Sequence, residues 1–157
     1  MVTELAHPGP ATTELPEAIR SRIIEHARRD DPNEACGLII GSAPAAAGGR
    51  ALRFVATRNT AASPYRYEID SGELLAATIE ADTNGEEIWG IVHSHTHTAA
   101  QPSPTDVGLA YYPDALYVLV SLAESEADPR DGAPGIRAWR IVAGDVFEVG
   151  LSWSAPE

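Results

Sequence analysis

The chain is poor in cysteine and in long apolar runs, and each shortage excludes a class of protein. Cys36 is the single cysteine among 157 residues, so no intramolecular disulfide can form and we expect a cytoplasmic location. No apolar run reaches the roughly 18 residues that a membrane-spanning helix needs, so no membrane association is expected. Residues 1–13 contain no Lys or Arg, and Pro8 and Pro10 interrupt them, so we expect no secretory signal.

Basic residues are also scarce. The chain has 23 acidic against 11 basic residues, which gives a formal net charge of -12. Such a charge would repel a phosphate backbone, so nucleic acid is not expected as a partner. An acidic surface keeps a protein soluble, and it indicates no particular protein partner by itself.

The length and the 44% hydrophobic content predict one domain, residues 14–157, after a flexible N-terminal arm, residues 1–13. Apolar periodicity predicts a helix over 16–29, another that follows Asp70 as N-cap and runs to 85, and a short one opening at Ser103. Strands are predicted at residues 36–41, 52–56, 65–69, 88–92, 115–122, 136–142 and 146–151. Crossover and hairpin connections both occur, which indicates an α/β domain with a mixed β-sheet flanked by helices.

Two histidines at the end of a predicted strand suggest a metal site. His93 and His95 are two residues apart, so both imidazoles lie on one face of the strand. Asp106 can add a third ligand from the first turn of the next helix. Three protein ligands leave the fourth tetrahedral position open for water, which is typical of a catalytic zinc. The pattern therefore predicts one zinc ion held by these three side chains.

Taken singly, the residues in and near this pattern have ordinary structural interpretations. Ser103, Pro104 and Asp106 form a good helix start, with Ser103 as N-cap. Glu34, which precedes the apolar run 36–41, would alone be a solvated loop carboxylate. Cys36 is expected to be a small buried hydrophobe. His7 and His26 are given no functional role.

His97 offers an alternative set of zinc ligands. If the strand continued, His93, His95 and His97 would share one face and form a three-histidine site. The strand would then have to run through Thr, Ala and Gln residues that are typical of a loop, and Asp106 and Glu34 would have no role. We therefore expect His97 to lie behind the ligands or to face the substrate.

The complete pattern resembles the JAMM (MPN+) metalloproteases. Their motif is His-x-His, seven residues, Ser, two residues and Asp, and this chain matches it from His93 to Asp106, with Glu34 in the place of the family's upstream glutamate. The four motif positions would coincide by chance with a probability of roughly 5 × 10⁻⁴. The resemblance implies a JAMM/MPN domain with a cytidine-deaminase-like fold. It also implies that Glu34 acts as general base and that Ser103 donates a hydrogen bond to the oxyanion.

Longer segments narrow the resemblance to the small actinobacterial JAMM peptidases; they are residues 28–37, 63–73, 93–96 and 113–121. Members of that group release cysteine from the C-terminal glycine of CysO, a ubiquitin-like sulfur-carrier protein. Others trim residues after the Gly-Gly end of carriers in other pathways, such as siderophore biosynthesis. The resemblance implies a carrier with a C-terminal Gly-Gly as partner, lying along residues 57–67 and the loop after His95. Departures at residues 97–101 leave the released amine open.

The sequence argues against two other functions. A cytidine deaminase requires a Pro-Cys-x-x-Cys segment, and one cysteine excludes that ligand set. A non-catalytic MPN scaffold usually lacks the His and Asp ligands, all of which are present here. The oligomeric state is not predicted.

Overall fold

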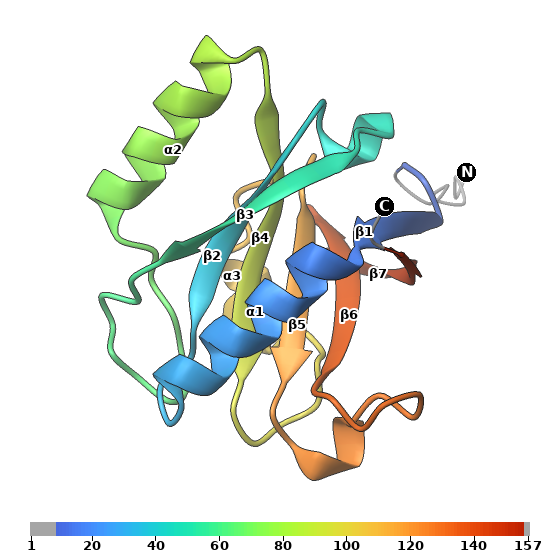
Figure 1. The fold of residues 1–157 in the computed structure, drawn as a ribbon. Coiled ribbons are helices and arrows are strands. Elements are labelled where there is room, and N and C mark those ends of the chain that lie inside the picture. Colours follow the sequence, from blue (N-terminus) through green and yellow to red (C-terminus); the bar gives the residue numbers. More distant parts are fainter. Residues whose placement is uncertain (1–8, 156–157) are drawn as a thin grey trace, which may run out of the picture.

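The computed structural model describes residues 9–155, and its centre is a seven-stranded mixed sheet (Figure 1). The strand order is β1-β7-β6-β5-β4-β2-β3. The strands are β1 (Thr12–Pro16), β2 (Cys36–Gly41), β3 (Ala51–Thr57), β4 (Glu87–His95), β5 (Leu116–Ser121), β6 (Gly135–Val142) and β7 (Asp145–Ser154). The pairs β4–β5 and β1–β7 are parallel and the other pairs are antiparallel. The predicted mixed α/β sheet is confirmed.

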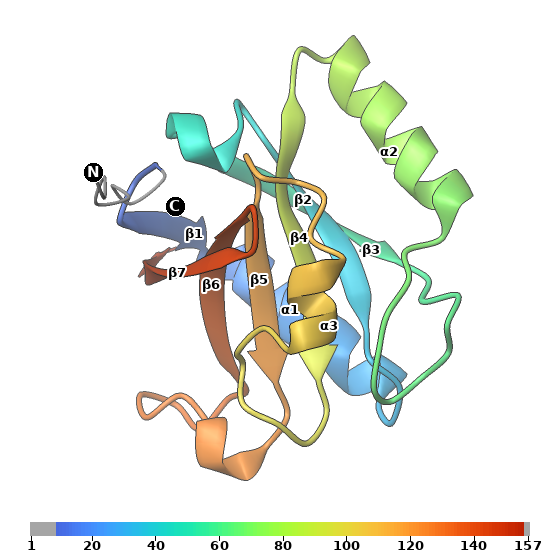
Figure 2. The same cartoon turned by 180° about the vertical axis from the view of Figure 1, so that it is seen from behind.

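Helices cover both faces of this sheet. The helix α1 (Glu17–Asp30) crosses one face, where Ile19, Ile23 and Ile24 are buried (Figure 1). On the opposite face lie α2 (Ser71–Thr83) and the short α3 (Pro104–Gly108), as Figure 2 shows from behind. Two 3-10 turns, Ala45–Ala47 and Glu124–Glu126, complete the helical elements of the described residues. The central strands β2 and β5 are buried along their whole length because both of their faces are covered.

Most predicted elements are confirmed, but the N-terminal boundary was wrong. Thr12 and Thr13 belong to β1 and pair with Gly150 and Leu151 of β7, so they are not part of an arm. Residues 1–8 of that predicted arm lie outside the described residues. Pro16 ends β1 and serves as N-cap of α1, so it is not the first helical residue. The Pro and Thr residues of this segment do not indicate a strand, and the partner strand β7 is more than 130 positions away in the chain.

The predicted strand at residues 65–69 was also wrong. Only Ile69 forms a bridge there, with Asn59. The Asn59 side chain replaces a partner strand, because its Nδ2 donates to the carbonyl of Arg66 and its Oδ1 accepts from the amide of Glu68. An amide side chain can thus satisfy backbone groups that alternation of residue types would assign to a sheet.

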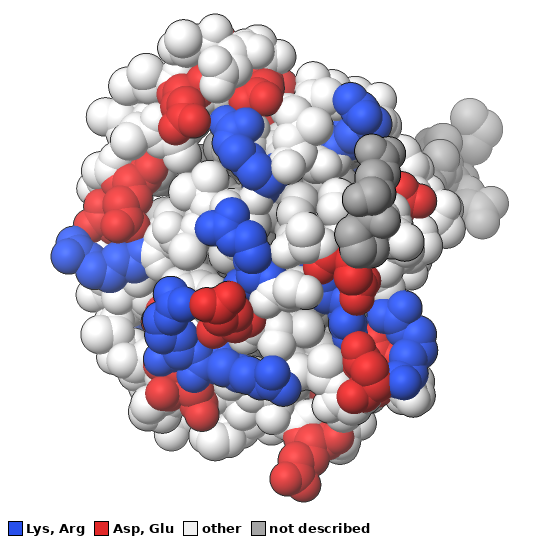
Figure 3. Space-filling model, in the orientation of Figure 1, with Lys and Arg blue, Asp and Glu red and all other residues white. Residues whose placement is uncertain are grey.

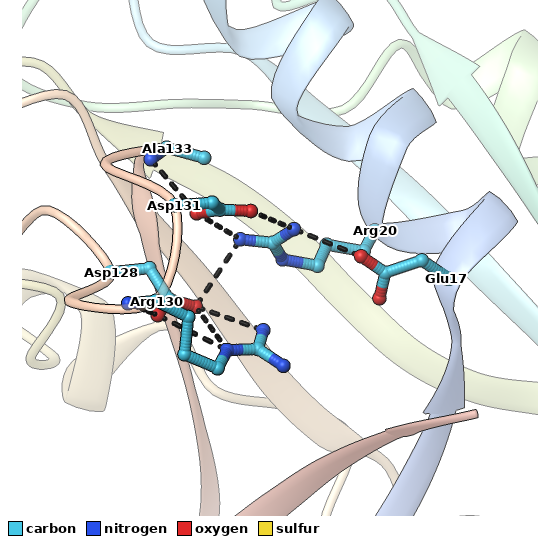
Figure 4. A network of polar contacts seen from close by, with 6 residues as sticks. All are labelled: Glu17, Arg20, Asp128, Arg130, Asp131 and Ala133. Carbon is cyan, nitrogen blue, oxygen red and sulfur yellow. Dashed lines mark hydrogen bonds and ion pairs between the residues drawn. The ribbon is translucent and has the colours of Figure 1, made fainter. Parts of the chain in front are cut away.

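A buried arginine ties α1 to the loop before β6. The Arg20 guanidinium donates to Glu17, Asp128 and Asp131, and Figure 4 shows it enclosed by these carboxylates. The Arg20 side chain is only 6% exposed. A charge this well buried is tolerated because the surrounding carboxylates pair with it.

Arg20→Ala is expected to lower the free energy of unfolding by about 1–3 kcal/mol, because it removes several charge-assisted hydrogen bonds at once. Arg28→Ala changes the same charge at an exposed position of α1 and is the matched control. Urea unfolding of both variants measures the effect. Equal midpoints for the two variants would show that the Arg20 cluster contributes nothing.

Basic and acidic side chains are interleaved on the face drawn in Figure 3, so no large area of that face carries charge of one sign. Several arginines of the chain form ion pairs, as in Arg29–Glu25, Arg53–Glu86 and Arg58–Asp70. Among residues 9–155, no helix combines the length and the apolar character that crossing a bilayer requires.

Candidate metal and catalytic site

The structure brings the three predicted zinc ligands together at the end of β4. His93 Nε2 lies 3.2 Å from His95 Nε2. Asp106 Oδ2 lies 3.2 Å from His93 Nε2 and 3.1 Å from His95 Nε2. His93 and His95 are buried, and the Asp106 side chain is 9% exposed. These residues form the group of potential metal ligands found within the described part of the chain.

These separations suit a tetrahedral zinc ion. Zinc binds nitrogen and oxygen ligands at about 2.0–2.1 Å, which places neighbouring ligand atoms of a tetrahedron about 3.3 Å apart. The three observed separations of 3.1–3.2 Å are close to that value. Two imidazoles and one carboxylate are also the donor types that a catalytic zinc takes. The residues present therefore fit the metal.

Local structure explains why the three side chains converge. The two histidines alternate with Ser94, so the strand period puts both rings on one face of β4. Asp106 is the third residue of α3 and closes a capping box with Ser103. The Ser103 amide donates to Asp106 Oδ2 at 2.8 Å, while Ser103 Oγ accepts from the Asp106 amide at 3.1 Å. Asp106 therefore both stabilises the start of α3 and supplies a metal ligand.

Electrostatics keep Asp106 ionised. Burial alone would raise the pKa of this carboxyl, but hydrogen bonds from His93 and His95 outweigh burial and hold the pKa well below its usual range. Burial lowers the pKa of His93, which favours the neutral imidazole that binds metal. For His95, burial lowers the pKa, but hydrogen bonds with Asp106 and with the carbonyl of Ala99 reverse this and raise it.

Glu34 lies beside the ligands, in the segment that leads into β2. Its amide donates to the carbonyl of Ser63, and its own carbonyl accepts from Asn59 Nδ2. Ser94, between the two histidine ligands, accepts from the Ala35 amide through Oγ at 2.7 Å. Because these contacts anchor the backbone on both sides, the Glu34 segment is fixed relative to the end of β4.

The carboxyl of Glu34 is buried and available. Glu34 is 5% exposed, and its Oε1 has no hydrogen-bond partner among residues 9–155. Burial raises the pKa of Glu34 to about 7, His95 lowers it and Asp106 raises it further. A buried polar atom without a partner is rare in proteins and requires an explanation, and a catalytic role is one such explanation. A carboxyl that titrates near neutral pH is suited to act as general base.

The raised pKa of Glu34 predicts how the stability of the metal-free protein depends on pH. Because the pKa rises from 4.5 to about 7 on folding, the folded state binds the proton more tightly, and this stabilisation is lost as pH rises from about 4.5 through about 7. Glu34→Gln cannot ionise, so it is expected to be about 1–3 kcal/mol more stable than wild type at pH 8 and equal to it at pH 4. Urea unfolding in the presence of a chelator measures both values. An unchanged difference between the two pH values would contradict this assignment.

None of the remaining predicted residues that the structure describes belongs to the cluster of metal ligands. His97 follows the end of β4, is exposed, and does not belong to the ligand cluster, so the three-histidine alternative is wrong. Cys36 is fully buried, as predicted, and burial raises the pKa of its thiol to about 11. His26 Nε2 contacts the carbonyl of Cys36 and has a packing role. His7 lies outside the described residues.

Sequence reasoning missed two residues that hold the site in place. The Tyr67 ring stacks on His93, with centroids 4.3 Å apart and an interplanar angle of 20°. Ser94 links the metal-binding strand to the Glu34 segment, as described above. Ser94 could have been suspected from its position between two ligands. Tyr67 gave no such signal, since its contact with His93 joins distant parts of the chain.

A cavity of 440 Å³ reaches the metal site beside Asp106. Its lining includes Arg66, Tyr67, Glu68 and Ile69, together with residues of α3 and of the segment that follows it: Thr105, Leu109, Tyr111 and Tyr112. The predicted substrate groove therefore shares Arg66 and Tyr67 with this cavity. The loop after His95, the other part of the predicted groove, stays a prediction.

Comparison with known proteins identifies the family of the chain. A family model described as prokaryotic homologs of the JAB domain matches residues 16–142. The CysO-cysteine peptidase of Mycobacterium tuberculosis is 41% identical over 126 residues, which cover 80% of each chain. The desampylase of Haloferax volcanii is 32% identical over 65% of this chain and 75% of its own length. A solved structure from Desulfitobacterium hafniense has a TM-score of 0.76 and 30% identity over 91% of this chain and 93% of that one.

Proposed function

The chain belongs to the prokaryotic JAB domain family, and from that premise we propose that it is a JAMM-type zinc peptidase. Its substrate is the bond after the C-terminal glycine of a ubiquitin-like sulfur-carrier protein, and the group released is cysteine. The protein acts in the cytoplasm, where its single thiol stays reduced.

One observation carries the proposal: three ligand atoms lie 3.1–3.2 Å apart beside Glu34, whose buried Oε1 has no hydrogen-bond partner in the part of the chain that the structure describes. A scaffold would need neither a metal-sized cluster nor a carboxyl with its pKa raised to about 7. Hydrolysis needs both, because water must be activated and its proton must be accepted.

The residues of the chain divide the work of hydrolysis. When bound, zinc lowers the pKa of water from about 15.7 toward about 7 and polarises the scissile carbonyl. Glu34 takes the proton of the attacking water and passes it to the leaving amine. Ser103 Oγ accepts a hydrogen bond from Asp106, so its own proton is free to be donated to the oxyanion. Such a contact contributes about 2.7–4 kcal/mol to transition-state stabilisation.

The substrate assignment rests on the relatives and on the cavity. The chain is similar to a CysO-cysteine peptidase over 80% of that protein's length and to a desampylase over 75% of that protein's length. A Gly-Gly tail carries no side chains, so it can lie extended in a narrow groove and be held by main-chain contacts. We place the tail in the cavity between Arg66–Ile69 and α3, which leads to Asp106.

Incubation of the zinc-loaded protein with a carrier bearing a C-terminal cysteine tests the proposal. Mass spectrometry should show the carrier losing one cysteine residue, and a chelator should abolish that loss. Carriers extended by other residues, tested in parallel, report whether the enzyme trims carriers of other pathways instead. An intact carrier in every arm, or cleavage that survives the chelator, would refute the proposed function.

A further inference from the structure

The peptide unit between Ala99 and Ala100 joins the metal ligand His95 to a carboxylate outside the cluster. His95 Nδ1 lies 2.7 Å from the carbonyl oxygen of Ala99. The amide of Ala100, in the same peptide unit, donates to Glu126 Oε1 at 3.0 Å. Glu126 belongs to the turn Glu124–Glu126, which precedes β6. Neither Glu126 nor its turn was assigned any role by the sequence.

A planar peptide transmits position from one end to the other. The carbonyl of Ala99 and the amide of Ala100 point in opposite directions within one rigid plane, so a carboxylate that holds the amide also aims the carbonyl. Resting on the proposed zinc site, we propose that Glu126 is a positioning residue for His95, acting through this peptide unit. Its role is to fix the ring orientation and the tautomer in which Nε2 faces the metal.

The chemistry of the successive hydrogen bonds from Glu126 to His95 supports this role. A hydrogen bond to an ionised carboxylate is roughly twice as strong as one between neutral groups, and it polarises the peptide so that its carbonyl accepts more strongly. A strong acceptor at Nδ1 keeps the imidazole proton there. The lone pair of Nε2, the atom that lies 3.1 Å from Asp106 Oδ2, is then available to the metal. Carboxylates that contact a metal-bound imidazole directly act in the same sense.

Neighbouring contacts prevent the peptide from turning over. Ser121 Oγ donates to the carbonyl of Thr98 at 2.6 Å, and Trp139 Nε1 donates to the carbonyl of Ala100 at 2.9 Å. Ala100 is 1% exposed. The carbonyl of Ala99 also accepts from the Gln101 amide at 2.8 Å. The loop after β4 is therefore held from β5 and β6 as well as from Glu126.

The other histidine ligand has no equivalent support. His93 Nδ1 is buried and lacks a hydrogen-bond partner within the described part of the chain, and its ring is held by stacking on Tyr67. Among residues 9–155, of the two imidazoles only that of His95 has a hydrogen-bond partner at Nδ1. Loss of Glu126 should therefore weaken metal binding through His95 alone, so we expect a partial loss.

The experiment compares zinc affinity in wild type, Glu126→Ala, Glu126→Gln and Glu124→Ala by competition with a chelating dye. Glu126→Ala should weaken zinc about tenfold, the lower end of the effect of removing a hydrogen-bond partner of a ligand. Glu126→Gln retains an acceptor oxygen, so its zinc affinity should stay within about threefold of wild type. A small loss is expected because a neutral hydrogen bond is weaker than a charge-assisted one. Glu124→Ala removes the same charge from an exposed position of the same turn and should bind zinc like wild type.

The absorption spectrum of the cobalt-substituted protein adds a readout that loss of stability alone would not change. Altered bands in Glu126→Ala, with wild-type bands in Glu124→Ala, are expected. Wild-type affinity and bands in Glu126→Ala would overturn the inference, and so would an equal loss in Glu126→Ala and Glu124→Ala. Failure of the wild-type protein itself to bind zinc would instead refute the proposed function.

Discussion

Glu34→Gln is expected to retain one zinc per chain and to lose turnover by about 10²–10⁴-fold. The factor is the contribution typical of a positioned general acid or base. Gln has the shape of Glu but cannot accept the proton of the attacking water. Since Glu34 is not one of the converging ligand atoms, its replacement leaves the donor set intact. Measurement of kcat on a carrier conjugate, beside the zinc content of the same preparation, separates the two effects.

Glu25→Gln, at an exposed position of α1, is the control for this loss and should keep full activity. The pH profile gives a further check, because wild-type activity should fall in acid as Glu34 becomes protonated and the ligand imidazoles bind protons. Turnover by Glu34→Gln at the wild-type rate would remove Glu34 from the mechanism.

His95→Ala and Asp106→Ala are expected to lose the metal itself. Each leaves two of three protein ligands, so affinity should drop by more than the roughly 10–100-fold that follows loss of a ligand's hydrogen-bond partner. Asp106→Ala also opens the capping box of α3 and should cost about 1 kcal/mol of stability. Zinc content after dialysis against a weak chelator measures the effect.

His97→Ala is the matched control for His95→Ala, because it removes an exposed imidazole two residues further on. It should retain zinc. If His95→Ala kept stoichiometric zinc at wild-type affinity, the three-ligand site would be wrong.

Sequence alone could predict the parts of the site that depend on local geometry. The positions of His93 and His95 follow from the two-residue period of a strand, and Asp106 follows from the helix start at Ser103. The structure brings these residues together as that geometry requires. Most strands and helices were predicted for the same reason, since apolar periodicity is a local property.

Parts that depend on contacts between distant segments could not be derived from local patterns. The position of Glu34 beside β4 depends on the pairing of Cys36 with His93, which local patterns do not predict. Only the resemblance to a family motif therefore indicated Glu34. The role proposed for Glu126 and the stacking of Tyr67 depend on loops whose course the sequence does not indicate. In residues 65–69, the Asn59 side chain supplied hydrogen bonds that strand alternation had wrongly assigned to a sheet.

A crystal structure of the zinc-loaded protein, with anomalous scattering recorded at the zinc edge, tests the central claim most directly. The expected result is one anomalous peak about 2.0–2.2 Å from His93 Nε2, His95 Nε2 and an oxygen of Asp106, with the Glu34 carboxylate facing it. Absence of a peak from that position, or a Glu34 side chain turned away from it, would contradict the account.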